Sequence, residues 1–171
     1  MNKTYINILF ALALIFFSLN IYANELENKN RYKISILSIG EGPSLVDAFG
    51  HTAIRVKDAQ LKNDIVFNFG VYDFNSPNFY SNFVKGRPEY KLAIQNYSNL
   101  IQNYIRQKRY IVEHQLNLDQ NSTKIIIDLL VEKLNNPYYI YDYFRDNCTT
   151  RIADIVIDKT NNKFKDNKLE S

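Results

Sequence analysis

Three side chains in this sequence could together carry out nucleophilic chemistry: the single cysteine, Cys148, and two histidines, His51 and His114. A thiolate attacks a carbonyl carbon, and a neighbouring imidazole accepts the proton and later returns it. A single cysteine cannot form a disulfide within its own chain. It is therefore a small buried apolar side chain, a link to another molecule or a reactive thiol.

The stretch "YDYFRDNCTTRIADIV" (141–156) places Cys148 in the first turn of an expected helix. Asp146 or Asn147 is a suitable N-cap, and the apolar stripe of that helix begins at Ile152, four residues after the cysteine. A helix N-terminus presents unpaired N–H groups and the positive end of the helix dipole. Both lower a thiol pKa below its free value of about 8.5, so the position suits a reactive thiol as well as a buried one.

The two histidines differ in their expected surroundings. His51 follows Gly50 at the start of a predicted strand, where a side chain can point from the end of a sheet into a cleft. His114 lies in the middle of "RYIVEHQLNL" (109–118), whose alternating pattern predicts a half-buried strand with His114 on its apolar face. We therefore interpret His51 as the candidate base and His114 as a core histidine.

A third group is needed to hold the imidazole in the right tautomer. Residues 51–70 are predicted to form a β-hairpin that turns near residue 60, which places Asn68 diagonally across from His51 on the same face. A slip of one residue in the pairing would put Asn68 on the other face. Tyr72 and Asp73 follow closely in the sequence and compete with Asn68 for this role.

The hydrophobic pattern predicts strands alternating with helices. Strands are expected over 32–40, 51–56, 64–70, 90–95 and 109–118, and helices over 77–86, 97–108 and 122–134, with a last helix from Cys148. Helices and mostly antiparallel strands are thus mixed along the chain. This order predicts a single α+β domain.

The N-terminus predicts export from the cytoplasm. A positive residue, an apolar run and a small residue before a cleavage point are typical of a secretory signal peptide over residues 1–23, although an uncleaved anchor has a similar pattern. A polar lead-in follows over 24–31, and the folded domain is expected over 32–160 with a polar tail over 161–171. The domain should therefore work in the periplasm or at the outer face of the cytoplasmic membrane.

The composition argues against several functions. The formal net charge is only +3 and the basic residues are scattered, so no nucleic-acid partner is expected. One cysteine and two separated histidines do not supply the usual zinc ligands, and "GEGPS" lacks the rest of a nucleotide-binding loop. We expect neither a metal nor a cofactor.

Four blocks of the sequence resemble the Lnb-type N-terminal periplasmic domain: "SLVDAFGHTAIRV", "VFNFGVYDFNSPNFYSNFVKGRPEYKLA", "YIVEHQLNL" and "YIYDYFRDNCTTRIADIV". The resemblance covers roughly residues 32–160, and "FGHTAIRV" combined with "DNCTTR" is its specific part. The family includes bacterial lipoprotein intramolecular transacylases. It is similar to circularly permuted papain-like (NlpC-type) cysteine enzymes, in which the histidine strand precedes the cysteine helix.

This resemblance implies Cys148 as the nucleophile and His51 as the general base. It also implies that the neighbours of the cysteine shape the site: Asp146, Asn147, Thr149, Thr150 and Arg151. The N–H groups of the first helical turn are then candidates to stabilise an oxyanion.

Three functions stay open at this stage. The first is an acyltransferase acting on lipoproteins or lipids, as the transacylases do when they move an acyl chain from the glyceryl ester to the N-terminal amine. The second is a cysteine hydrolase of cell-wall peptide or amide bonds, and the third is a binding module without catalysis. A bilayer substrate would be reached through an uncleaved N-terminus, a partner or exposed aromatics, because 13 tyrosines and 11 phenylalanines could form a membrane-contacting surface as well as a core.

Overall fold

The computed structural model describes residues 10, 12–18, 31–43, 47–72 and 79–160, with the side chains of 158–160 left out. Asp73 and the predicted helix start at Pro77 lie outside these residues, as does most of the predicted signal segment. Within the described part, no helix combines the length and apolar character needed to span a bilayer.

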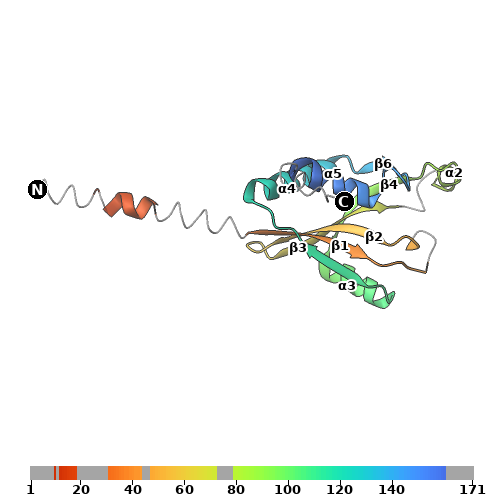
Figure 1. The fold of residues 1–171 in the computed structure, drawn as a ribbon, viewed down its shortest axis with the longest axis horizontal. Helices are drawn as coiled ribbons and strands as arrows, with labels where there is room; N and C mark the ends of the chain where they lie inside the picture. Colours follow the sequence, from red (N-terminus) through yellow and green to blue (C-terminus); the bar gives the residue numbers. More distant parts are fainter. Residues whose placement is uncertain (1–9, 11, 19–30, 44–46, 73–78, 161–171) are drawn as a thin grey trace, which may run out of the picture.

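A six-stranded sheet in the order β5-β1-β2-β3-β4-β6 forms the centre of the domain (Figure 1). Each neighbouring pair of strands in it is antiparallel. The strands are β1 (Tyr32–Ile39), β2 (His51–Asp58), β3 (Asn63–Val71), β4 (Glu89–Asn96), β5 (Ile111–Gln115) and β6 (Tyr138–Ile140). This arrangement confirms the α+β class predicted from the sequence.

Helices cover both faces of the sheet. They are α2 (Phe79–Val84), α3 (Tyr97–Arg106), α4 (Gln120–Asn135) and α5 (Cys148–Thr160). Figure 1 shows α4 and α5 on one face of the sheet, α3 on the opposite face and α2 at one end of the domain. The helix that carries Cys148 therefore packs on the sheet against β2 and β3 and also contacts α4.

Alternation along the strands divides the core into two clusters, because successive side chains point to opposite faces. On β2, Ile54 and Val56 pack with α4 and α5, whereas Ala53 packs with Leu100 of α3. Ile152 of α5 is buried in the first cluster, and Cys148 packs against the edge of the same cluster. The predicted apolar stripe thus fixes which side of α5 faces the sheet.

The hairpin of β2 and β3 has the predicted register. Ile54 pairs with Phe67 and Asp58 with Asn63, so the same register carries Ala53 to the position opposite Asn68. A bulge in the pairing of β3 with β4 follows between Asn68 and Val71. The residues predicted to share a face are therefore brought to one end of the hairpin.

Two local predictions were wrong. Strand β5 is almost entirely exposed, and His114 lies on the surface rather than in the core, because β5 is an edge strand that pairs only with β1. The aromatic passage before the cysteine contains a short strand, β6, that the sequence pattern did not reveal. Three residues are too few to show an alternation.

Candidate active site

A cleft of about 760 Å³ opens beside the N-terminus of α5. It is lined by residues 50–52 at the start of β2, by Tyr141, Tyr143 and Phe144 in the segment after β6, and by residues 147–150. Cys148 and His51 therefore meet in one cleft although 97 positions separate them in the sequence. Among the described residues, no three His, Cys, Asp or Glu side chains are placed to hold a metal ion.

The Cys148 thiol is free and partly buried, and its pKa is lowered to about 7. Burial opposes the charged form and is the largest single effect, which raises the pKa, but the lowering effects together outweigh it, led by the hydrogen bond and the positive charge offered by His51. The backbone N–H of Thr52 and the hydroxyl of Thr149 lower it further. Several donors thus converge on one sulfur atom.

The position of His51 depends on Gly50. Gly50 has φ of +73°, a left-handed conformation that glycine adopts without steric cost, and its N–H donates to the carbonyl oxygen of Asp47 at 3.0 Å. His51 pairs with Ile39 at the end of β1. The chain therefore turns sharply at Gly50 and enters the sheet with the imidazole at the mouth of the cleft.

Asn68 contacts the imidazole on its other side. Its Oδ1 lies 3.3 Å from Nε2 of His51, and its side chain is only 7% exposed. The amide oxygen accepts a hydrogen bond from Nε2–H of the imidazole, which leaves Nδ1 to interact with the thiol. The diagonal pairing predicted from the hairpin is therefore present, and the orienting role of Asn68 stays a prediction.

The two competing candidates for that role differ in outcome. The ring of Tyr72 packs against Tyr90, with 5.5 Å between centroids, and Tyr72 does not line the cleft. Asp73 lies outside the described residues.

Asn147 caps the cysteine helix. Its Oδ1 accepts from the N–H groups of Thr149 and Thr150 at 2.9 and 3.0 Å, and its own N–H donates to Oγ1 of Thr150 at 2.9 Å. Two of the first-turn N–H groups that the sequence offered as oxyanion candidates are therefore already bonded to the cap. The N–H of Cys148 is outside this capping arrangement.

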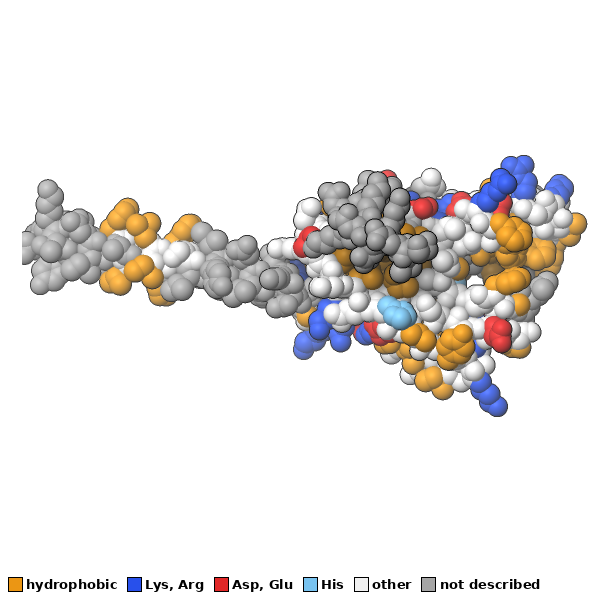
Figure 2. Space-filling view, in the orientation of Figure 1, with side chains coloured by type: hydrophobic (Ala, Val, Ile, Leu, Met, Phe, Trp, Pro, Cys, Tyr) orange, Lys and Arg blue, Asp and Glu red, His pale blue; other side chains and the backbone are white. Residues whose placement is uncertain are grey.

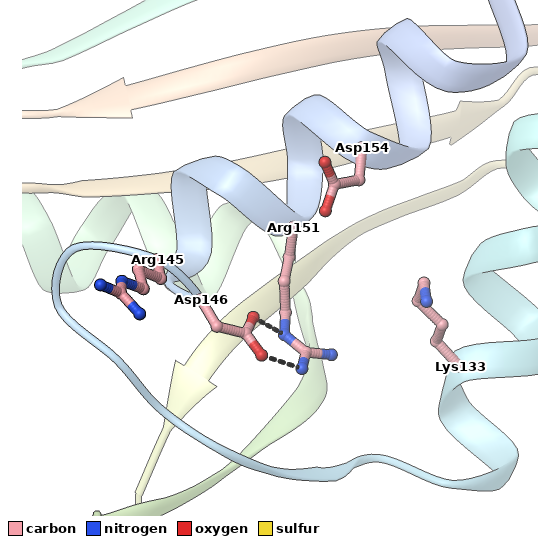
Figure 3. Close-up of a pocket in the computed structure, with 5 residues that line it drawn as sticks. All are labelled: Lys133, Arg145, Asp146, Arg151 and Asp154. Atoms are coloured by element: carbon pink, nitrogen blue, oxygen red, sulfur yellow. Dashed lines mark hydrogen bonds and ion pairs between the residues drawn. The ribbon is translucent and has the colours of Figure 1, made fainter.

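Asp146 and Arg151 hold the segment that leads into α5. Two parallel hydrogen bonds of 2.6 Å join Nε and Nη2 of Arg151 to the carboxylate of Asp146, and the guanidinium lies 3.6 Å from the ring centroid of Tyr139. Figure 3 shows this pair beside a separate polar hollow that Lys133 also borders. Both residues stabilise the base of the site without lining the thiol cleft.

The remaining predicted neighbours of the thiol are in contact with it or with the helix cap. Oγ1 of Thr149 lies 4.0 Å from Sγ of Cys148 and 2.9 Å from Oγ1 of Thr52, which joins the cysteine helix to β2. Thr150 completes the cap with Asn147. Thr52 was missed from the sequence, because a backbone N–H donor leaves no signature in residue type.

Tyr141 is the second residue that sequence reasoning missed. Its hydroxyl interacts with both the thiol and the backbone N–H of Cys148, and its pKa is raised by burial first and then by the charge of the thiolate. The ring packs against Tyr90 and Tyr143, with centroids 4.5 and 5.2 Å away. The aromatic passage before the cysteine was visible in the sequence, but nothing distinguished this tyrosine from its neighbours.

Comparison with protein families places this site in context. Residues 23–170 match the family model described as the Lnb N-terminal periplasmic domain. The chain belongs to this family. The Lnb domain is periplasmic by description, so the predicted location outside the cytoplasm is confirmed. No curated protein and no solved structure matches the chain significantly, and the relation to permuted papain-like enzymes stays a prediction.

The Asn147 cap can be tested for its effects on the stability of this Lnb domain and on the reactivity of Cys148. We expect Asn147→Ala to lower the free energy of unfolding by about 1 kcal/mol, the usual cost of losing such a cap, and to slow alkylation of Cys148 severalfold. The matched control is Asn96→Ala, because Asn96 caps α3 in the same way. Urea unfolding should show a similar loss for both variants. Slower alkylation in the Asn96 variant as well would show that the cap has no specific effect on the thiol.

Proposed function

We propose that this Lnb domain is a thiol enzyme that transfers acyl groups through a thioester on Cys148. The observation that carries the proposal is the pairing of a thiol of pKa about 7 with His51, which also contacts Asn68. Near pH 7 about half of such thiols are ionised. A cysteine that only fills space needs no such partners, whereas a nucleophile does.

The first half of the reaction cleaves an ester. The thiolate of Cys148 attacks the carbonyl carbon, the C–S bond forms, and the C–O bond to the leaving alcohol breaks. Protonated His51 donates its proton to the departing alkoxide, so the products are a thioester and a neutral alcohol. In the second half an amine attacks the thioester carbonyl, the C–N bond forms, the C–S bond breaks, and His51 takes the proton from the nitrogen.

The charge that develops on the carbonyl oxygen needs hydrogen-bond donors. The N–H of Cys148 and the hydroxyl of Tyr141 are two groups next to the sulfur that suit this task, because the hydroxyl interacts with both the thiol and this N–H. An oxyanion bound here would accept hydrogen bonds from both groups and so replace the hydrogen bond that joins the Cys148 N–H to the Tyr141 hydroxyl.

The lining of the cleft favours an acyl chain over a cell-wall peptide. Among the described residues no aspartate, glutamate, lysine or arginine lines it, and five aromatic side chains do: Phe49, Phe83, Tyr141, Tyr143 and Phe144. A wall peptide carries carboxylates and amines that charged side chains normally pair with, whereas a fatty acyl chain requires only apolar contacts. The proposed substrates are therefore bacterial lipoproteins or related lipids.

Incubation of the protein with a diacylglyceryl lipopeptide in detergent, followed by tandem mass spectrometry, tests this proposal. Transfer within one molecule leaves the mass unchanged and moves an acyl group to the N-terminal amine. We expect Cys148→Ala to abolish this product and Tyr141→Phe to reduce its rate about 10- to 100-fold. Alkylation of Cys148 by iodoacetamide forms no oxyanion, so Tyr141→Phe should slow that alkylation much less than it slows acyl transfer, only through the lost hydrogen bond to the thiolate.

Other outcomes separate the alternatives. Free fatty acid with a matching loss of mass would make the enzyme a lipid hydrolase. Release of peptides from cell-wall material, dependent on Cys148, would replace the proposal with the wall-hydrolase function. A protein that acts on neither substrate while retaining a reactive thiol would favour the binding module.

A further inference from the structure

Three large apolar side chains stand out from the surface around the cleft. Phe49, Val84 and Phe144 are 85%, 86% and 92% exposed, which makes them the most exposed large apolar residues that the structure describes. Burying such side chains is favourable, so folding alone gives no reason to leave all three in solvent. A cluster of this kind on a soluble domain marks an interaction surface.

These side chains come from three separate segments that border the thiol cleft. Phe49 precedes β2, Val84 ends α2, and Phe144 lies in the loop before α5. Phe49 and Phe144 line the mouth of the thiol cleft together with Phe83, the neighbour of Val84. We call Phe49, Val84 and Phe144 the cleft rim.

Positive charges lie next to the cleft rim. Lys85 and Arg87 follow Val84, and both are exposed. Arg145 follows Phe144 and is also exposed, but it borders the separate polar hollow of Figure 3. Figure 2 shows hydrophobic side chains gathered at the end of the domain where α2 lies, bordered by lysine and arginine.

Two acidic residues are close in sequence to the same segments. Glu89 lies at the start of β4, and Asp142 precedes the rim residue Phe144. The carboxylate of Asp142 accepts the N–H groups of Phe144 and Arg145 at 2.8 and 3.0 Å. Asp142 is therefore engaged in its own turn, whereas Glu89 is exposed two residues after Arg87.

We propose that the cleft rim inserts into the surface of an anionic phospholipid bilayer while the neighbouring cations contact the headgroups. Apolar side chains flanked by lysine and arginine are the usual pattern of interfacial binding. A protein partner would explain the apolar residues but not the cations around them. The inference rests on the proposed function only for its purpose: if Cys148 accepts acyl groups, docking of the rim places an acyl donor in the bilayer directly at the mouth of the thiol cleft.

The chain contains no tryptophan, so a single introduced tryptophan reports on its own surroundings. Phe144→Trp places the reporter in the cleft rim, and Ile105→Trp places a matched control on α3, where Ile105 is 66% exposed. With vesicles of phosphatidylglycerol and phosphatidylethanolamine, we expect the emission of the first variant to shift to the blue and to be quenched by brominated lipids. The control should show neither change, even if the N-terminal segment also binds the vesicles.

A second pair of variants tests the charges. In the Phe144→Trp background, Lys85→Glu with Arg87→Glu should raise the lipid concentration for half-maximal quenching at least tenfold, since each cation contributes roughly fivefold. Lys124→Glu on α4 is the control and should have little effect. Equal quenching at Phe144 and Ile105, no quenching at either position, or equal binding to pure phosphatidylcholine vesicles would each overturn the proposal. Acyl transfer in detergent does not depend on docking, so it distinguishes this failure from failure of the proposed function.

Discussion

Alkylation of Cys148 by iodoacetamide will rise with pH and reach half its plateau rate near pH 7, well below the midpoint of about 8.5 for a free thiol. The thiolate is the reactive form, so the alkylation rate follows its population. Burial alone would move the midpoint upward, and the hydrogen bonds and charge around the thiol, those of His51 first, together more than reverse that effect. The difference in midpoint between the wild type and a variant without His51 therefore measures the coupling between the two residues.

Removing His51 should leave burial as the dominant effect on the pKa of Cys148, and burial raises that pKa. In His51→Ala the pKa of Cys148 is expected to return to about 9 or above, because the thiol loses its main stabilising partner and stays partly buried. The remaining thiolate is intrinsically more nucleophilic, which offsets part of the loss. At pH 6 the alkylation rate should then fall about tenfold, and the midpoint should rise by about two pH units.

The second histidine supplies the control for this experiment. His114 is exposed on the edge strand β5, and His114→Ala should leave the midpoint of Cys148 unchanged. If the wild-type midpoint lay at 8.5 or higher, or if both histidine variants behaved alike, the Cys148–His51 pair would be refuted and the proposed enzyme with it.

The parts of this site that could be predicted from sequence are those in which residue type and spacing determine the result. With one cysteine and two histidines in the chain, only two Cys–His pairs were possible, and Gly50 before His51 indicated a strand end. Asn68 followed from the two-residue period of a hairpin, because a correct register fixes which side chains share a face. The N-cap was narrowed to Asp146 or Asn147 by residue preference, and the structure assigns it to Asn147.

The parts that could not be predicted depend on tertiary contacts. Tyr141 is one tyrosine in a run of aromatic residues, and only the folded path of the segment between β6 and α5 brings its hydroxyl to the thiol. Thr52 acts through its backbone N–H, which every residue except proline carries. The exposure of His114 depends on β5 being an edge strand, and an alternating pattern does not show how many neighbours a strand has.

Replacing Gly50 with alanine should damage both stability and the site. A non-glycine residue at φ of +73° costs about 1–2 kcal/mol, and a Cβ atom at this position would lie 2.6 Å from the carbonyl oxygen of Ile39. That oxygen belongs to the backbone of β1, so the strand end itself must move. We expect Gly50→Ala to lower the free energy of unfolding by about 2–4 kcal/mol in urea.

Gly86→Ala separates the two contributions. Gly86 has nearly the same conformation, with φ of +70°, but an added Cβ would meet no atom within 4 Å. It should therefore show only the conformational cost of about 1–2 kcal/mol, with the alkylation of Cys148 unchanged. In Gly50→Ala the displaced strand end carries His51 away from the thiol, so alkylation at pH 6 should slow about as much as in His51→Ala. Equal losses of stability in the two glycine variants, with Cys148 equally reactive in both, would mean that the turn at Gly50 does not position His51.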